Sequence, residues 1–193
     1  MDELLNAGVK VIQYRHKAPF LRSHWEECRT LASKAHQRGA VFIVNDRVDM
    51  AKACGAHGVH LGQEDLPPDK ARRFTGQGMY IGFSTHNLEQ AQAALQLPVD
   101  YIAVGPVFAT ASKQNPDPIV GVELICSIWS LTDKPVVAIG GITVSNAASV
   151  LKAGAAAVAV IGDLLRAPNI EARAREFLKK LADPIEDGAA MRY

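Results

Sequence analysis

The sequence predicts an α/β fold, and within that class a (β/α)8 TIM barrel. Short apolar runs rich in Val and Ile alternate with segments that carry apolar residues at helical spacing, which indicates parallel strands joined by right-handed helical crossovers. Polar residues suited to an active site follow nearly every predicted strand, whereas an open doubly wound sheet would concentrate them at one switch point. Gly140-Gly141 and Gly162 follow the last two predicted strands, where barrels commonly bind phosphate.

The apolar runs predict seven strands. They lie at residues 9–14, 41–44, 58–61, 79–83, 101–107, 136–139 and 157–161. Segments rich in Ala, Leu, Glu and Lys predict amphipathic helices between them, for example at 24–38, 87–95 and 145–152. The chain opens with residues 2–7, which have the pattern of a helix end with no strand before it. Because a barrel of this class has eight strands, we expect its first strand to be absent from this sequence.

A glycine follows several of the predicted helices, just before the next strand. These glycines are Gly8, Gly39, Gly55 and Gly154. Glycine adopts the left-handed conformation that ends a helix at no steric cost. The repeated pattern therefore marks the helix-to-strand turns of a βα repeat.

Length and composition indicate one globular domain over residues 1–193, with 183–193 as a flexible tail. The chain is 48% hydrophobic, and its 21 basic and 20 acidic residues leave a net charge of +1. No overall positive field attracts nucleic acid or an acidic membrane, so any anion site must be local. The longest apolar run, residues 153–162, is too short to span a bilayer.

The cysteines and the N-terminus indicate a reducing compartment. Cys28, Cys54 and Cys126 are odd in number and widely spaced, and we interpret all three as buried thiols rather than as a disulfide framework. The first residues carry two acids and no apolar run of the kind that a secretory signal needs. A cytoplasmic location is the resulting expectation.

Residues 13–17, Gln-Tyr-Arg-His-Lys, close the first predicted strand with two cations. Arg15 and Lys17 stand two residues apart, which places them on one side of an extended backbone. A planar guanidinium beside a point charge suits a phosphate or a diphosphate. A solvated strand end could carry the same residues.

Acidic residues follow the next two predicted strands. Asn45-Asp46 follows one strand, where it could bind a metal or cap a helix, and Asp65 lies in the polar segment after the other. Carboxylates from neighbouring strand ends, facing cations from a third, are what Mg²⁺ needs to bridge to a diphosphate.

Two hydroxyl-bearing segments follow later strands. Ser84 could be either a ligand or a helix cap. The loop from Thr110 through Ala111 and Ser112 to Lys113 can hold an anion through its hydroxyls, its backbone N–H groups and its lysine. The six histidines show no metal-binding spacing, and no Ser/His/Asp set is visible, so nucleophilic catalysis is not the obvious mode.

Taken together, six motifs in order resemble the thiamine phosphate synthase family over residues 7–181. They are residues 13–17, 44–47, 58–65, 84–86, 105–108 and 138–142. The resemblance implies a (β/α)8 barrel that joins 4-amino-2-methyl-5-hydroxymethylpyrimidine diphosphate to hydroxyethylthiazole phosphate, giving thiamine phosphate and diphosphate. It implies a transferase of thiamine biosynthesis that binds Mg²⁺ and small-molecule substrates, and leaves open whether the chain is a homo-oligomer.

The resemblance also implies roles for individual residues. Those expected to receive the pyrimidine diphosphate are Gln13, Arg15, Lys17, Asn45, Ser84 and Lys113, with Tyr14 and His16 also counted as substrate-binding. Asp46 and Asp65 are expected to bind Mg²⁺, and Arg15, Lys17 and Lys113 to be catalytic. The thiazole loop is expected at Thr110, Ala111 and Ser112, and the cradle for the thiazole's phosphate at Gly141, Ile161 and Gly162.

The sequence departs from the family pattern at two positions. Ser112 stands where the family usually has a threonine, and Gly162 where it usually has a serine. The second change removes a hydroxyl, so we expect weaker binding of the thiazole phosphate. Two other functions remain as alternatives: a non-catalytic phosphate-binding paralogue, and an isomerase like the thiazole tautomerases, which we expect to lack the acidic residues at 45–46 and 63–65.

Overall fold

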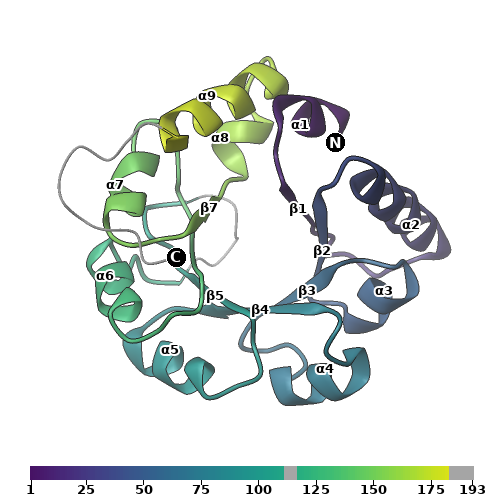
Figure 1. Cartoon of the computed structure of the whole chain (residues 1–193), viewed down its shortest axis with the longest axis horizontal. Helices are drawn as coiled ribbons and strands as arrows, with labels where there is room; N and C mark the ends of the chain where they lie inside the picture. Colours follow the sequence, from purple (N-terminus) through teal and green to yellow (C-terminus); the bar gives the residue numbers. More distant parts are fainter. Residues whose placement is uncertain (111–116, 183–193) are drawn as a thin grey trace. The chain divides into compact units, whose positions relative to one another are not determined.

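The computed structural model describes residues 1–110 and 117–182, and its seven strands follow one another in the sheet in chain order (Figure 1). They are β1 (Val11–Tyr14), β2 (Val41–Asn45), β3 (Gly58–Leu61), β4 (Tyr80–Thr85), β5 (Tyr101–Val104), β6 (Val136–Ile139) and β7 (Ala157–Ala159). The strand pairs whose register is described are all parallel. This is the parallel βα repeat that the sequence predicts, with the predicted number of strands.

Helices separate the strands. They are α1 (Asp2–Ala7), α2 (Arg22–Gln37), α3 (Val48–Ala53), α4 (Pro68–Thr75), α5 (Leu88–Leu95), α6 (Glu123–Trp129), α7 (Ala147–Lys152), α8 (Gly162–Leu165) and α9 (Ile170–Ala182). Within the described residues, no helix is long and apolar enough to cross a membrane.

The chain divides into two compact units. The first holds residues 1–83 and 97–100, and the second holds residues 84–96 with the described residues from 101 onward. In the first unit, α2, α3 and α4 lie on the same face of strands β1 to β4 (Figure 1). Its core includes Phe42, Val44, Val59 and Leu61, which are fully buried. The corresponding core of the second unit includes Ile102, Val104, Ile125 and Val136.

The predicted glycine turns are confirmed. Gly8, Gly39, Gly55 and Gly154 all have positive φ at helix ends. The fifth strand is shorter than predicted, because it stops at Val104, just before Gly105 and Pro106. Proline has no backbone N–H to continue the ladder.

The prediction of three buried thiols is wrong for one of them. Cys28 and Cys54 are buried and free, but Cys126 is exposed. Cys126 lies on α6, whose buried residues are Ile125 and Ile128, so the helix turns the thiol toward solvent. Burial raises the pKa of the Cys28 thiol to about 12, which keeps it protonated and unreactive.

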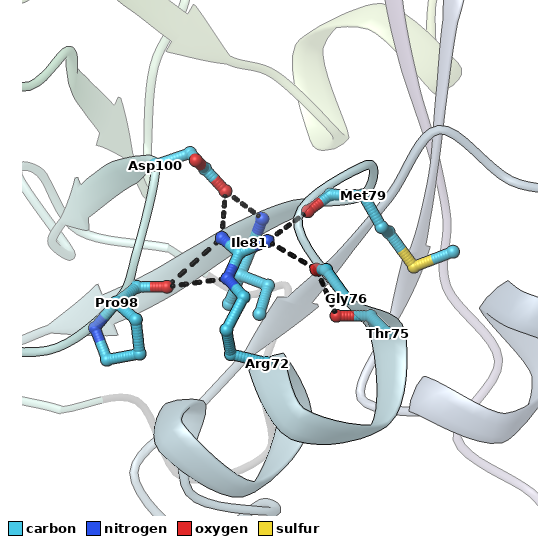
Figure 2. Close-up of polar contacts among 7 residues, drawn as sticks. All are labelled: Arg72, Thr75, Gly76, Met79, Ile81, Pro98 and Asp100. Atoms are coloured by element: carbon cyan, nitrogen blue, oxygen red, sulfur yellow. Dashed lines mark hydrogen bonds and ion pairs between the residues drawn. The ribbon is translucent and has the colours of Figure 1, made fainter.

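Arg72 links α4 to the segments that precede β4 and β5 (Figure 2). Arg72 donates from its guanidinium to four oxygen atoms: the Gly76, Met79 and Pro98 carbonyls and Asp100 Oδ2. Asp100 Oδ2 also accepts from the Ile81 N–H, at 2.7 Å. All five N–H groups of the guanidinium are therefore used within the first unit.

Candidate active site

The side chains of residues 13–17, at the end of β1 and just after it, separate into two sets. The Tyr14 hydroxyl donates to Glu27 Oε2 of α2 at 2.6 Å, and the His16 ring lies against His24 of α2 with centroids 3.9 Å apart. Because side chains alternate along an extended strand, Gln13 and Arg15 face the other way. Tyr14 and His16, both expected to bind substrate, thus lie on the side of α2. The structure does not bring them together with Gln13 and Arg15.

Lys17 reaches across to the end of β2. Its ammonium forms an ion pair with the carboxylate of Asp46, which has a left-handed backbone with φ of 66°. The helix-cap alternative for Asn45 and Asp46 does not hold, because the N-cap of α3 is Arg47 and no side chain caps that helix. The Asp46 carboxylate is instead held beside the predicted diphosphate-binding lysine.

Asp65 lies beside Asp46 in the same unit. Asp65 Oδ2 accepts a hydrogen bond from the Gly62 N–H at 2.7 Å. Burial raises the pKa of Asp65, the Gly62 hydrogen bond lowers it, and the neighbouring Asp46 carboxyl raises it further. A carboxyl group whose ionisation is disfavoured by burial and by a neighbouring carboxyl forms a site that a cation would stabilise.

These carboxylates fit Mg²⁺. No group of three or more His, Cys, Asp or Glu side chains suited to a metal occurs among the described residues. Mg²⁺ does not require one, because it is usually held by one or two carboxylates together with water and substrate phosphate oxygens. Asp46 and Asp65 are oxygen donors of the required type and number.

Two buried polar residues lie under this site. Asn45 and His60 are register partners on β2 and β3, 6% and 8% exposed, so their side chains project from the same face of the sheet. Burial lowers the pKa of His60 to about 4, and the nearby Asp46 only partly opposes that effect. The imidazole is therefore neutral at pH 7. The sequence analysis tests the histidines only for metal-binding spacing and finds none, and burial leaves no local signal that would have singled out His60.

In the second unit, Ser84 lies inside β4 and does not cap α5. That helix is capped by Asn87, whose side-chain oxygen accepts from the Gln90 N–H at 2.8 Å. The neighbouring Thr85 is fully buried and donates to the Ala103 carbonyl at 3.1 Å. Ser84 is therefore not a helix cap.

Gly141 of the predicted phosphate cradle and the preceding Gly140 allow close backbone approach. Gly140 and Gly141 both have positive φ, and a Cβ on Gly141 would lie 2.4 Å from the Ala109 carbonyl oxygen. Any other residue at Gly141 would have to displace the segment at Phe108 and Ala109, and that segment leads into the predicted thiazole loop. Of that loop, Thr110 is described, whereas Ala111, Ser112 and Lys113 lie outside the described residues.

The other half of the cradle follows β7. The strand ends at Ala159, two residues earlier than predicted, and Ile161 is the N-cap of the short helix α8, which begins at Gly162. Asp163, the next residue of α8, accepts from the Val144 N–H at 3.2 Å. This contact links the two segments that carry Gly141 and Gly162.

Comparisons with known proteins show which proteins this chain resembles. A family model described as thiamine monophosphate synthase matches residues 1–164. The thiamine-phosphate synthase of Koribacter versatilis is 50% identical over 179 residues, which cover 93% of this chain and 83% of that protein. The thiamine-phosphate synthase of Pelotomaculum thermopropionicum is 44% identical over 173 residues, covering 90% and 79%. The structure of a thiamine phosphate pyrophosphorylase from Pyrococcus furiosus superposes with a TM-score of 0.85 at 36% identity, covering 93% of this chain and 86% of that one.

Proposed function

The chain belongs to the thiamine monophosphate synthase family, and we propose that it catalyses that family's reaction with the residues described above. It is a transferase that joins 4-amino-2-methyl-5-hydroxymethylpyrimidine diphosphate to hydroxyethylthiazole phosphate and releases diphosphate. The fold is the α/β, TIM-barrel-like fold of its relative from Pyrococcus furiosus.

The observation that carries the assignment of roles is the cluster of Lys17, Asp46 and Asp65. Lys17 is paired with the Asp46 carboxylate, and the Asp65 carboxyl beside them has a raised pKa. One ammonium group does not balance two carboxyl groups. We assign Asp46 and Asp65 to hold Mg²⁺, which when bound would neutralise part of the diphosphate charge. A phosphate-binding paralogue or a tautomerase has no diphosphate to neutralise and no need for this set.

The cations around the diphosphate stabilise the leaving group. Arg15 and Lys17 follow β1, and Lys113 is assigned the same task from the family resemblance. As the bond to the pyrimidine methylene breaks, negative charge grows on the diphosphate, so cations fixed beside it lower the barrier. The attacking thiazole nitrogen carries no proton to remove, so this site needs no general base.

The second substrate is assigned to the second unit. Gly141 and the Ile161-Gly162 backbone receive the thiazole's phosphate through N–H groups, and Thr110 belongs to the loop that contacts the thiazole. Gly162 offers no hydroxyl, so the phosphate depends on backbone donors there. The proposal includes a cytoplasmic location, as suits an enzyme that acts on small phosphorylated substrates.

The test is release of diphosphate when both substrates and Mg²⁺ are supplied to the wild-type chain and to Asp65→Asn. We expect the variant to lose most of its activity, on the order of a hundredfold, and to require more Mg²⁺ for what remains. Asp69→Asn is the matched control, because Asp69 lies on the surface of α4 in an ion pair with Lys70, and it should match the wild type. Normal turnover by Asp65→Asn at limiting Mg²⁺ would refute the metal assignment, and no diphosphate release by the wild type would refute the function.

A further inference from the structure

We propose that Asn146 is a positioning residue that fixes the backbone between Gly141 and Thr143 for the substrate's phosphate. The inference rests on the proposed function, because it takes Gly141 as part of the phosphate cradle. Asn146 is the N-cap residue of α7, yet its side chain makes no cap hydrogen bond to that helix. Its amide is turned instead toward the preceding loop.

Both ends of the Asn146 amide bind that loop. Asn146 Oδ1 accepts from the Thr143 N–H at 2.8 Å, and Asn146 Nδ2 donates to the Gly141 carbonyl at 3.0 Å. Two further backbone bonds, from the N–H groups of Asn146 and Ala147 to the Thr143 carbonyl, hold the same turn at 3.2 and 3.0 Å. Only a side chain with a donor and an acceptor on one planar group can make both amide contacts, so aspartate and leucine cannot replace it.

The carbonyl contacts determine where the N–H groups point. In a trans peptide the C=O of one residue and the N–H of the next are antiparallel. The Gly140 carbonyl accepts from the Phe108 N–H at 3.1 Å, so the Gly141 N–H is directed away from Phe108. The Gly141 carbonyl is held by Asn146, so the Ile142 N–H is directed away from Asn146. The orientation of two consecutive N–H donors is thus fixed, one of them by Asn146.

This orientation would not be maintained by the backbone alone. Gly140 and Gly141 have φ of 88° and 66°, and glycine explores more backbone conformations than any other residue. A peptide between such residues can rotate unless its carbonyl is held. Free rotation at Gly141 would remove the ordered N–H donors that an anion requires.

A second contact holds the far end of the loop. Asp163 Oδ2 accepts from the Val144 N–H at 3.2 Å and lies 3.9 Å from an N–H group of Arg173 on α9. Asp163 follows Gly162 directly, so this contact fixes the Val144 end of the loop relative to the Gly162 side of the cradle. Asn146 then determines the conformation between Gly141 and Thr143.

The experiment compares Asn146→Leu with the wild type by calorimetric binding of hydroxyethylthiazole phosphate and of unphosphorylated hydroxyethylthiazole. Leucine has the branched shape and the same number of heavy side-chain atoms as asparagine but no donor or acceptor, and it adds no charge near the phosphate. We expect the Kd of the phosphorylated ligand to rise by about tenfold to a hundredfold, the range typical of lost supporting hydrogen bonds. We expect the Kd of the unphosphorylated ligand and the KM of the pyrimidine diphosphate to change by less than about twofold, because neither uses this loop.

Asn169→Leu is the matched control. Asn169 accepts from the Ala172 N–H at 2.8 Å at the start of α9, so the same substitution removes one hydrogen bond without touching the loop. It should leave both affinities unchanged. If Asn146→Leu does not fold, Asn146→Ser takes its place, since serine is smaller and cannot span the distance to both partners.

The outcomes separate the inference from the proposed function. Equal weakening of the phosphorylated and unphosphorylated ligands would show that Asn146 supports the fold in general, and unchanged affinity would show that the loop needs no support. Either result overturns the inference while wild-type diphosphate release still supports the function. A wild-type chain that binds no thiazole phosphate would overturn both.

Discussion

Replacing Arg72 by alanine should destabilise the first unit far more than a substitution on an exposed helix face usually does. The side chain is only 10% exposed, and its five N–H groups lie 2.6 to 3.3 Å from four oxygen atoms. Three of those oxygens are main-chain carbonyls, of Gly76, Met79 and Pro98, which would lose a donor. The fourth belongs to Asp100, whose side chain is 41% exposed, so the ion pair itself is screened and contributes about 1 kcal/mol or less.

The expected loss follows from these contacts. Hydrogen bonds from a charged donor contribute about 1.5 to 3 kcal/mol each, but bonds that share one group are not additive, so we expect about 3 kcal/mol in total for Arg72→Ala. For a chain of this length that lowers the melting temperature by roughly 6 to 12 °C. Arg73→Ala is the matched control, because Arg73 is the next residue of α4 and is exposed.

Urea unfolding followed by circular dichroism measures both variants. Asp100→Asn separates the charge from the geometry, since asparagine can still accept from the Ile81 N–H but carries no charge. We expect it to cost less than half as much as Arg72→Ala. If Arg72→Ala unfolds at the same urea concentration as Arg73→Ala, the guanidinium does not hold these segments together and the reasoning fails.

Two further predictions concern the buried histidine and the phosphate cradle. His60 has a pKa of about 4 in the folded chain and about 6.5 in the unfolded chain, so the unfolded state binds the proton first as the pH falls. The contribution of the neutral imidazole to stability is therefore fully present above pH 6.5 and declines as the pH falls toward 4. At pH 5 the free energy of unfolding of the wild type should be about 2 kcal/mol lower than at pH 7, and His60→Gln should not show this loss. Urea midpoints that fall equally in both proteins would contradict the prediction. Gly162→Ser should tighten binding of the thiazole phosphate, by up to about 1.5 to 3 kcal/mol for a hydrogen bond to a charged partner, less the cost of ordering the serine side chain. Calorimetry showing equal or weaker affinity would mean that another donor already satisfies the phosphate.

The sequence by itself determined the repeating architecture and the positions of most candidate site residues. Apolar periodicity and left-handed glycines act within a few positions of the chain. Neighbouring residues are therefore enough to predict the glycine turns at Gly39 and Gly154 and the strands at 41–45, 58–61 and 136–139. Active-site residues follow strands for the same local reason, so the order of residues along the chain is enough to locate a motif such as Asn45-Asp46.

Local sequence patterns allowed two roles for the same residue, and the tertiary contacts decided between them. The sequence allowed Asp46 and Ser84 to be helix caps, and only the fold shows Asp46 paired with Lys17 and α5 capped by Asn87. Similarly, residues 13–17 form one group in the sequence, whereas α2 draws Tyr14 and His16 to its own side.

The sequence predicted that carboxylates at two strand ends face cations at a third, but which individual side chains pair across long stretches of the chain was decided by the fold. Arg72 and Asp100 are 28 positions apart, and Lys17 and Asp46 are 29 apart. Nothing in the residues around Arg72 distinguishes it from the exposed Arg73, because burial and hydrogen bonding depend on which segments the chain brings alongside α4. Helix and strand patterns depend on each residue's neighbours along the chain. The charge, the burial and the hydrogen-bond partners of a site depend on neighbours in space. Those neighbours come together only once the strands have paired.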